Sequence, residues 1–238
     1  MSGPDLAGLD LWSPERELFA AIRGNAALVF ADGTVTAVQG QAVELGDRSA
    51  RVESDGVTFD VMLNPLAEGT AADAGLHRSL QLCEVEGTMA AGGRPKSLHG
   101  LGLRTRSAHD PVGARRRRFV TAATADGSLV SVAAVRPDAG TPHGDELLAA
   151  SELTAQGGNG AVVFEEVRFS TIYGPDGLPR KASAELYRPG DELPARMSGQ
   201  AISAAPLERN GATIAIAFFR WTVTGRPAWG TYELEPAP

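Results

Sequence analysis

The chain has 238 residues, of which 43% are hydrophobic and 21% are charged, and its formal net charge is −7. These proportions are typical of a folded globular protein and exclude a largely disordered chain. The negative net charge disfavours non-specific binding to nucleic acid or to an anionic membrane, because both attract spread positive charge. We therefore expect neither as a partner.

The cysteine content and the N-terminal residues both indicate the cellular compartment in which the protein is expected. Cys83 is the only cysteine, so no disulfide can form within the chain, and a disulfide-stapled secreted fold is excluded. The first twelve residues contain two acidic residues and no basic residue, which is unlike a signal peptide. No apolar run reaches the length of a membrane span. We expect a cytoplasmic protein.

One helix is predicted near the start of the chain, within Pro14–Arg23. Ser13 can cap it, Pro14 suits its first position, and Gly24 can end it. Apolar residues at helical spacing follow the cap, namely Leu18, Phe19 and Ile22. This stripe predicts a helix that packs on a sheet.

After Gly24 the apolar pattern changes to the alternation of β-strands. The expected strands cover residues 26–30, 34–38, 50–52, 57–63, 80–89, 119–123, 129–135, 161–171, 212–223 and 231–234. Turn-forming pairs separate many of them, at residues 32–33, 55–56, 126–127, 176–177 and 210–211. Short strands joined by such turns predict an all-β, antiparallel meander that forms a barrel or sandwich, and they disfavour an α/β fold.

The chain is long enough for one large domain or two small ones. Residues 137–144 are rich in Pro, Gly and Asp and are typical of a linker. We therefore expect an N-terminal segment with the short helix (1–24), a first β domain (25–136) and a second β domain (145–238).

The predicted strand at residues 80–86 places acidic residues on a partly apolar face. Leu80 and Leu82 share a side with Glu84 and Glu86, by strict alternation. Such acids fit either a barrel lumen or a strand end in solvent, and solvated acids are the more common case.

The recognisable motifs of common enzymes are absent. The sequence has no nucleophile elbow, no phosphate-binding loop and no complete dinucleotide fingerprint. The four histidines, His77, His99, His109 and His143, are not paired at metal-ligand spacing. His143 with Asp145 and Glu146 is read as a solvated acidic turn rather than a metal site. No metal and no cofactor are expected.

Four consecutive arginines, residues 115–118, form the densest charge run. They could form a nucleic-acid patch, but Phe119 is the only aromatic residue beside them. The favoured interpretation is an exposed strand start at a sheet edge, where charge prevents pairing with another chain.

Aromatic residues gather near the C-terminus. Alternation puts Phe219 and Trp221 on one face of a strand, and Trp229, Thr231 and Glu233 on one face of the next. A carboxyl group buried among aromatic rings has a raised pKa and can act as a general acid. Alternatively, the tryptophans fill a barrel and Glu233 pairs with Arg220 or Arg226.

Two stretches together resemble a known superfamily. Residues 85–88 followed by His99-Gly100-Leu101-Gly102-Leu103-Arg104-Thr105-Arg106-Ser107 resemble the central pattern of lipocalin-like hydroxyneurosporene synthases (carotenoid hydratases) and AttH-like proteins. Residues 225–233, Gly-Arg-Pro-Ala-Trp-Gly-Thr-Tyr-Glu, resemble the closing segment of the same proteins. Thr105 and Arg106 replace the Asp and His of the central pattern, and Ala108 and His109 replace its Trp and Gly.

The resemblance implies lipocalin-like β-barrels, two consecutive or merged, around a lipophilic ligand, as in tocopherol-cyclase-like relatives. It predicts that the chain binds a small hydrophobic, isoprenoid- or polyketide-like molecule in an apolar cavity, with cofactor-free cyclisation or hydration as the chemistry of an enzyme. The alternative is a non-catalytic carrier that uses the same cavity. The expected proton donors are Glu233 and Glu86. The expected ligand-binding residues are Trp221, Trp229, Phe219, His99, Arg104 and Tyr232.

Overall fold

The computed structural model describes residues 6–54, 56–72, 78–91, 95–107, 116–138, 140, 142, 145–155, 161–209 and 212–235. Within these residues the chain forms eighteen β-strands and two helical turns of three residues each. No helix in this part of the chain is long and apolar enough to cross a membrane. The prediction of an all-β, antiparallel protein is confirmed.

The first half of the chain forms one nine-stranded antiparallel sheet. Its strands are β1 (Leu6–Ser13), β2 (Leu18–Arg23), β3 (Ala26–Ala31), β4 (Thr34–Gln39), β5 (Val43–Leu45), β6 (Ser49–Glu53), β7 (Val57–Thr70), β8 (Arg78–Ala91) and β9 (Lys96–Ser107). They lie in the order β4-β3-β2-β1-β9-β8-β7-β6-β5. The first and last strands of the half, β1 and β9, therefore pair at its centre.

The second half forms another nine-stranded sheet. Its strands are β10 (Arg116–Thr124), β11 (Ser128–Arg136), β12 (Leu147–Thr154), β13 (Ala161–Val163), β14 (Glu166–Tyr173), β15 (Pro179–Tyr187), β16 (Ala195–Arg209), β17 (Ala212–Val223) and β18 (Arg226–Glu235). They lie in the order β13-β12-β11-β10-β18-β17-β16-β15-β14. Each strand takes the place of the strand numbered nine lower in the first sheet, so the two halves share one topology.

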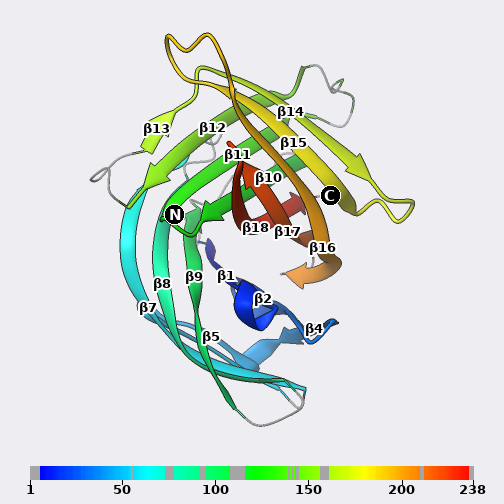
Figure 1. The fold of residues 1–238 in the computed structure, drawn as a ribbon. Helices are drawn as coiled ribbons and strands as arrows, with labels where there is room; N and C mark the ends of the chain where they lie inside the picture. Colours follow the sequence, from blue (N-terminus) through cyan, green and yellow to red (C-terminus); the bar gives the residue numbers. More distant parts are fainter. Residues whose placement is uncertain are drawn as a thin grey trace, which may run out of the picture.

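Both sheets are curled (Figure 1). In a flat sheet of nine strands the two edges would lie roughly 38 Å apart, at about 4.8 Å per strand. In each sheet, however, the two edge strands follow one another in the chain. The turn Gly40–Ala42 connects β4 to β5, and residues 164–165 connect β13 to β14. Such short connections require the edges to approach each other. The result is one nearly closed barrel and one half-barrel.

Three apolar clusters hold the fold together. One fills the concave face of the first sheet and includes Leu9, Leu11, Ile22, Phe59, Leu63 and Val85. Another fills the concave face of the second sheet and includes Val120, Val132, Phe219, Trp221 and Tyr232. The third joins the two sheets through their other faces and includes Trp12, Phe19, Leu82, Leu103, Phe119 and Phe218. Central strands are therefore buried on both faces.

This double burial explains why the predicted helix is wrong. Only Pro14–Arg16 forms a helical turn, and Glu17 ends it with a left-handed backbone at φ 49°. Leu18–Arg23 is the strand β2, and all six of its residues are buried. Alternate side chains of β2 enter the first concave core and the junction between the sheets. A strand covered on both faces is continuously apolar, and such a run also contains the spacing of a helix.

The boundary between the sheets differs from the predicted linker. The first sheet ends at Ser107 and the second begins at Arg116, whereas residues 137–144 connect β11 and β12 within one sheet. The segment rich in Pro and Gly therefore marks a connection between neighbouring strands rather than a change of sheet. Likewise, the N-terminal residues assigned to a separate segment supply β1 and β2 of the first sheet.

The strands predicted from alternation are present, with the run at 161–171 divided between β13 and β14. Positive φ values occur at Gly33, Gly127 and Gly177, as the turn pairs predict. Residues 55 and 210–211 lie outside the described residues.

Two glycines of the resembling segments keep the central strands close together. A Cβ atom on Gly100 in β9 would lie 2.4 Å from the carbonyl oxygen of Trp12 in β1. A Cβ on Gly230 in β18 would lie 2.0 Å from the carbonyl oxygen of Thr121 in β10. Since real Cβ atoms do not approach that closely, both positions exclude any side chain. The two sheets thus use the same device at their central strand pair.

Candidate functional site

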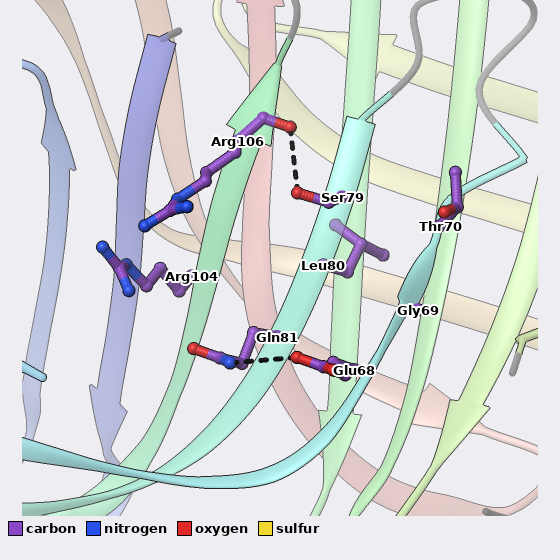
Figure 2. Close-up of a pocket in the computed structure, with 8 residues that line it drawn as sticks. All are labelled: Glu68, Gly69, Thr70, Ser79, Leu80, Gln81, Arg104 and Arg106. Carbon is purple, nitrogen blue, oxygen red and sulfur yellow. Dashed lines mark hydrogen bonds between the residues drawn. The ribbon is translucent and has the colours of Figure 1, made fainter. Parts of the chain in front are cut away.

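A pocket of about 520 Å³ lies at the end of the first sheet where β1 begins and β9 ends (Figure 2). Six of its lining residues form two rows across β7, β8 and β9. The rows are Glu68, Gln81 and Arg104, and Thr70, Ser79 and Arg106. Gly69 and Leu80 complete the lining between the rows. Arg104 also pairs with Leu9 of the concave core, so both rows face the concave side of the sheet.

Arg104 is the most buried charged group in this pocket, with 9% of the residue exposed. Its Nη1 donates to the backbone carbonyl of Asp47 at 2.5 Å, and its Nη2 to Oδ1 of Asp47 at 3.0 Å. Its Nε is buried and has no hydrogen-bond partner among the described residues. A guanidinium held in this way is charged, directional and incompletely satisfied.

Arg106 approaches the same carboxylate from the next row. Its Nη2 donates to Asp47 Oδ1 at 2.7 Å, so two guanidinium groups converge on one oxygen. The hydrogen bond and charge of Arg104, together with the charge of Arg106, lower the pKa of Asp47. Asp47 is nevertheless 84% exposed, because it sits on the short connection between β5 and β6.

Along β8, the polar side chain of Gln81 in the pocket is followed by Cys83, which belongs to the apolar core. The amide nitrogen of Gln81 donates to Glu68 at 3.3 Å. The amide oxygen of Gln81 faces Cys83, two residues further along the same face of β8. Burial raises the pKa of the Cys83 thiol to about 11, against the opposing charge of Arg104. At neutral pH this thiol is protonated, so it is a member of the apolar core behind the pocket rather than a nucleophile.

The second sheet carries an arginine at the equivalent place. Arg118 in β10 pairs with Leu234 in β18, just as Leu9 in β1 pairs with Arg104 in β9. Arg118 forms an ion pair with buried Glu146 and donates to Thr171 at 3.2 Å. Arg118 lies on the other strand of the central pair, but it occupies the same end of the concave face of its sheet as Arg104 does in the first sheet.

Tyrosine side chains occupy that end of the second sheet. The hydroxyl of Tyr232 lies 2.9 Å from Thr171 Oγ1 and 3.1 Å from the hydroxyl of Tyr173. Burial, with the neighbouring Tyr173, raises the pKa of Tyr232 despite the charge of Arg118. Phe169 stacks beside the cluster, with its ring 4.8 Å from the Arg118 guanidinium and 6.1 Å from the Tyr232 ring. Protein groups therefore cover Arg118, while Phe169 also lines a second pocket of about 420 Å³ together with Ala184 and Met197.

A buried polar network joins the two sheets. Arg23 of β2 lies 2.7 Å from Asp10 Oδ1 and 2.5 Å from Glu233 Oε2 of β18. Thr231 donates to the other Asp10 oxygen at 2.6 Å. All four residues are almost fully buried. Charges taken out of water in this way are stable only when they remain paired.

The charge state of Glu233 is the reverse of the expected one. Burial raises the pKa of its carboxyl, but the charges of Arg23, Arg78 and Arg209 outweigh burial and lower it to about 2. Glu233 is therefore ionised at neutral pH. Its partner is Arg23, 210 positions away in the chain, and not Arg220 or Arg226. The raised pKa of a general acid is therefore absent, and the alternative of an ion-paired Glu233 holds, with an arginine from a strand of the other sheet as the partner.

The other predicted residues fall in three places. Phe219, Trp221 and Tyr232 face the concave core of the second sheet, where the first two rings stack at 4.7 Å. Trp229 lies in the junction between the sheets, on the same strand face as Thr231 and Glu233. Of the predicted set, only Arg104 lines the pocket of the first sheet.

Glu86 and His99 lie together outside the pocket. They are paired across β8 and β9, with His99 Nδ1 3.8 Å from Glu86 Oε1. Their side chains are 53% and 72% exposed, so the solvated interpretation of these acids is confirmed for Glu86. The residues approach each other, but no buried environment surrounds them.

The interpretations of two charged segments need correction. β10 lies between β11 and β18, so Arg116–Arg118 do not begin an edge strand. Arg118 is 7% exposed on the concave face, whereas Arg116 lies on the same strand face but at the start of β10 and is exposed. Glu146 is also buried, against Arg118 and Arg136, rather than part of a solvated turn. Arg115, His77, His109 and His143 lie outside the described residues.

No group of three or more His, Cys, Asp or Glu side chains is placed to hold a metal ion in the part of the chain that the structure describes. Glu68, Gln81 and Arg106, which line the pocket, and Asp47, which pairs with both arginines, were not among the predicted site residues. The alternation of charged and polar residues at the end of β9 was a signal for Arg104 and Arg106. No local signal connects Asp47 with them, because the contact spans 57 residues.

Comparison with solved structures identifies the fold. Over 98% of this chain and 92% of the other, the structure resembles a candidate AttH from Nitrosomonas europaea, with a TM-score of 0.70 and 14% sequence identity. It also resembles CghA in complex with Sch210972, with a TM-score of 0.63 and 14% identity over 98% of this chain and 88% of CghA. No family model and no curated protein matches the sequence. The resemblance read from the sequence is confirmed at the level of fold: the chain has the AttH-like, lipocalin-like fold.

Proposed function

We propose that this protein binds a small organic molecule in the pocket at the end of the first sheet. The observation that carries the proposal is the pocket itself, about 520 Å³ in volume and lined by two rows of polar side chains on a concave face. This volume lies within the range of small-molecule sites, which are typically about 300–1,000 Å³. The complex of the similarly folded CghA with Sch210972 supports the same kind of ligand.

The ligand that suits this pocket has a polar group and an apolar body. Arg104, Arg106 and Gln81 offer hydrogen-bond donors to oxygen atoms, and Leu80 adds an apolar side chain to the lining. The earlier expectation of an isoprenoid- or polyketide-like molecule remains a proposal in this form. It requires that the polar end of the molecule meets the arginines.

A cofactor-free cyclase or hydratase is the second candidate. Two guanidinium groups that converge on one point can stabilise negative charge that develops on a bound carbonyl oxygen. Glu233 and Glu86 stay untested predictions as proton donors. An ionised Glu233 cannot donate a proton at neutral pH, and Glu86 is exposed, so we place the candidate chemistry at the arginines instead.

The test is to fill the pocket and follow a retained molecule. Ser79→Trp places a large ring between Thr70 and Arg106, and it should abolish any small molecule that native mass spectrometry finds on the purified protein. Ser97→Trp is the matched control, since Ser97 is an exposed serine of β9 outside the pocket. If both variants retain the same molecule as the unaltered protein, the binding site lies elsewhere.

A further inference from the structure

We propose that the ligand of this pocket carries a carboxylate group, and that Asp47 holds the place of this group in the free protein. The inference rests on the proposed function, because it names the chemical class of the molecule bound at that site. It follows from how Arg104 and Arg106 are satisfied. Their shared partner is a side chain that is itself almost entirely in solvent.

Arg104 is a buried charge that needs compensation. A buried guanidinium is stable only beside negative charge and hydrogen-bond acceptors. Asp47 supplies both, through Oδ1 and its backbone carbonyl. Arg104 is 9% exposed while the Asp47 side chain is 84% exposed. The Asp47 carboxylate remains hydrated and gives up little of its own solvation when it leaves, and the carboxylate of a ligand can then take its place beside Arg104.

Arg104 also has a hydrogen-bond donor, Nε, that no described residue uses. Asp47 engages Nη1 and Nη2 of Arg104 and leaves Nε without a partner among the described residues. Arginine binds a carboxylate best through two parallel N–H groups, and Nε with one Nη forms such a pair. A carboxylate that enters the pocket can therefore satisfy a donor that Asp47 does not reach.

The net charge of the pocket also favours an anionic ligand group. Arg104 and Arg106 are balanced by Asp47 and Glu68, and Glu68 accepts a hydrogen bond from Gln81 within the same row. When Asp47 swings away, one positive charge is left in the pocket. A carboxylate restores the balance, a neutral alcohol does not, and an amine would add to the imbalance.

The experiment compares two probes that differ only in the polar group. Decanoate below its micelle concentration and decanol below its solubility limit are titrated into the full-length protein by calorimetry. The unaltered protein should bind decanoate at least about tenfold more tightly than decanol, as expected for a charge-assisted pair. Asp47→Asn should increase the affinity for decanoate at least about threefold by removing the competing charge, and it should leave decanol unchanged.

Arginine variants separate recognition from folding. Arg106→Gln should reduce the preference for decanoate without loss of fold, since Arg106 is half exposed. Arg104→Gln should abolish the preference, and Arg104→Lys, which keeps the charge, should restore part of it. Glu53→Gln is the control, because it removes a carboxylate from an exposed pair with Arg51 that does not line this pocket.

Each other outcome contradicts a specific part of the proposal. Equal binding of decanol and decanoate would overturn the carboxylate inference and leave the binding function standing. Binding of neither probe would overturn both. Weaker binding of decanoate to Asp47→Asn would show that Asp47 orients the arginines and does not stand in for the ligand.

Discussion

The same end of the two sheets is built in two ways. In the first sheet, Arg104 faces a pocket and its carboxylate partner is exposed Asp47. In the second sheet, Arg118 is covered by tyrosine side chains, and its carboxylate partner Glu146 is only 7% exposed. The strand order is identical, and the arginine differs only in which of the two central strands carries it.

This difference shows how one strand order can place an arginine either where a ligand can bind it or where it only stabilises the interior. A buried, fully partnered arginine contributes to a rigid interior, because every donor around it is already satisfied. An arginine whose partner is in solvent can exchange that partner for a ligand. The fold places a cation at the end of a curled sheet, and the surrounding side chains decide whether it is available for binding.

The junction between the sheets tests whether the two halves behave as one unit. Glu233→Gln removes one of the two carboxylates beside Arg23 and should lower the free energy of unfolding by about 3 kcal/mol, the low end for a broken buried ion pair, because Arg23 keeps Asp10. The loss should also depend on pH. The folded-state pKa of about 2 lies below the ordinary value of 4.5, so the ion pair stabilises the fold fully above pH 4.5. This stability is lost as the pH falls toward 2.

Urea titrations at several pH values measure both effects. The difference in unfolding free energy between the original protein and Glu233→Gln should shrink as the pH falls from about 4.5 to about 2. Glu86→Gln serves as the control, since Glu86 is exposed and should change stability little. A difference that is constant with pH would show that Glu233 acts through packing rather than charge.

The filled end of the second sheet should tolerate less change than the open end of the first. Glu146→Gln leaves Arg118 and Arg136 without their shared carboxylate. We expect a loss of about 2–3 kcal/mol in the free energy of unfolding, because Arg118 keeps its hydrogen bond to Thr171. The measurement is urea unfolding at neutral pH, with Glu166→Gln as the control in an exposed pair with Arg168. An effect as small as that of the control would mean that burial of Glu146 carries no stability.

The sequence predicted those parts of this arrangement that depend on local pattern. Alternation and turn pairs identified the all-β class and many strands, and the resemblance of residues 99–107 to a known family pointed to Arg104, although β9 itself was not among the predicted strands. Strand β2 was mistaken for a helix because both of its faces are buried. The partners of the charged residues could not be predicted, because Asp47 and Arg104 meet only after the first sheet has curled, and Arg23 and Glu233 only after the two sheets have packed together.

The smallest expected effect is the loss of the carboxylate at Asp47. Asp47→Asn keeps the backbone carbonyl that accepts from Arg104 and keeps an oxygen near both arginines. Because the side chain is 84% exposed, the free energy of unfolding should fall by less than about 1 kcal/mol in urea titrations. The comparison with Glu146→Gln is the decisive one, since both variants remove one charge from an arginine at the same end of a sheet. If Asp47→Asn costs as much stability as Glu146→Gln, then Asp47 anchors the connection between β5 and β6, and the two ends are equivalent after all. If the cost is small, the first sheet holds its arginines ready for a ligand at little expense to the fold.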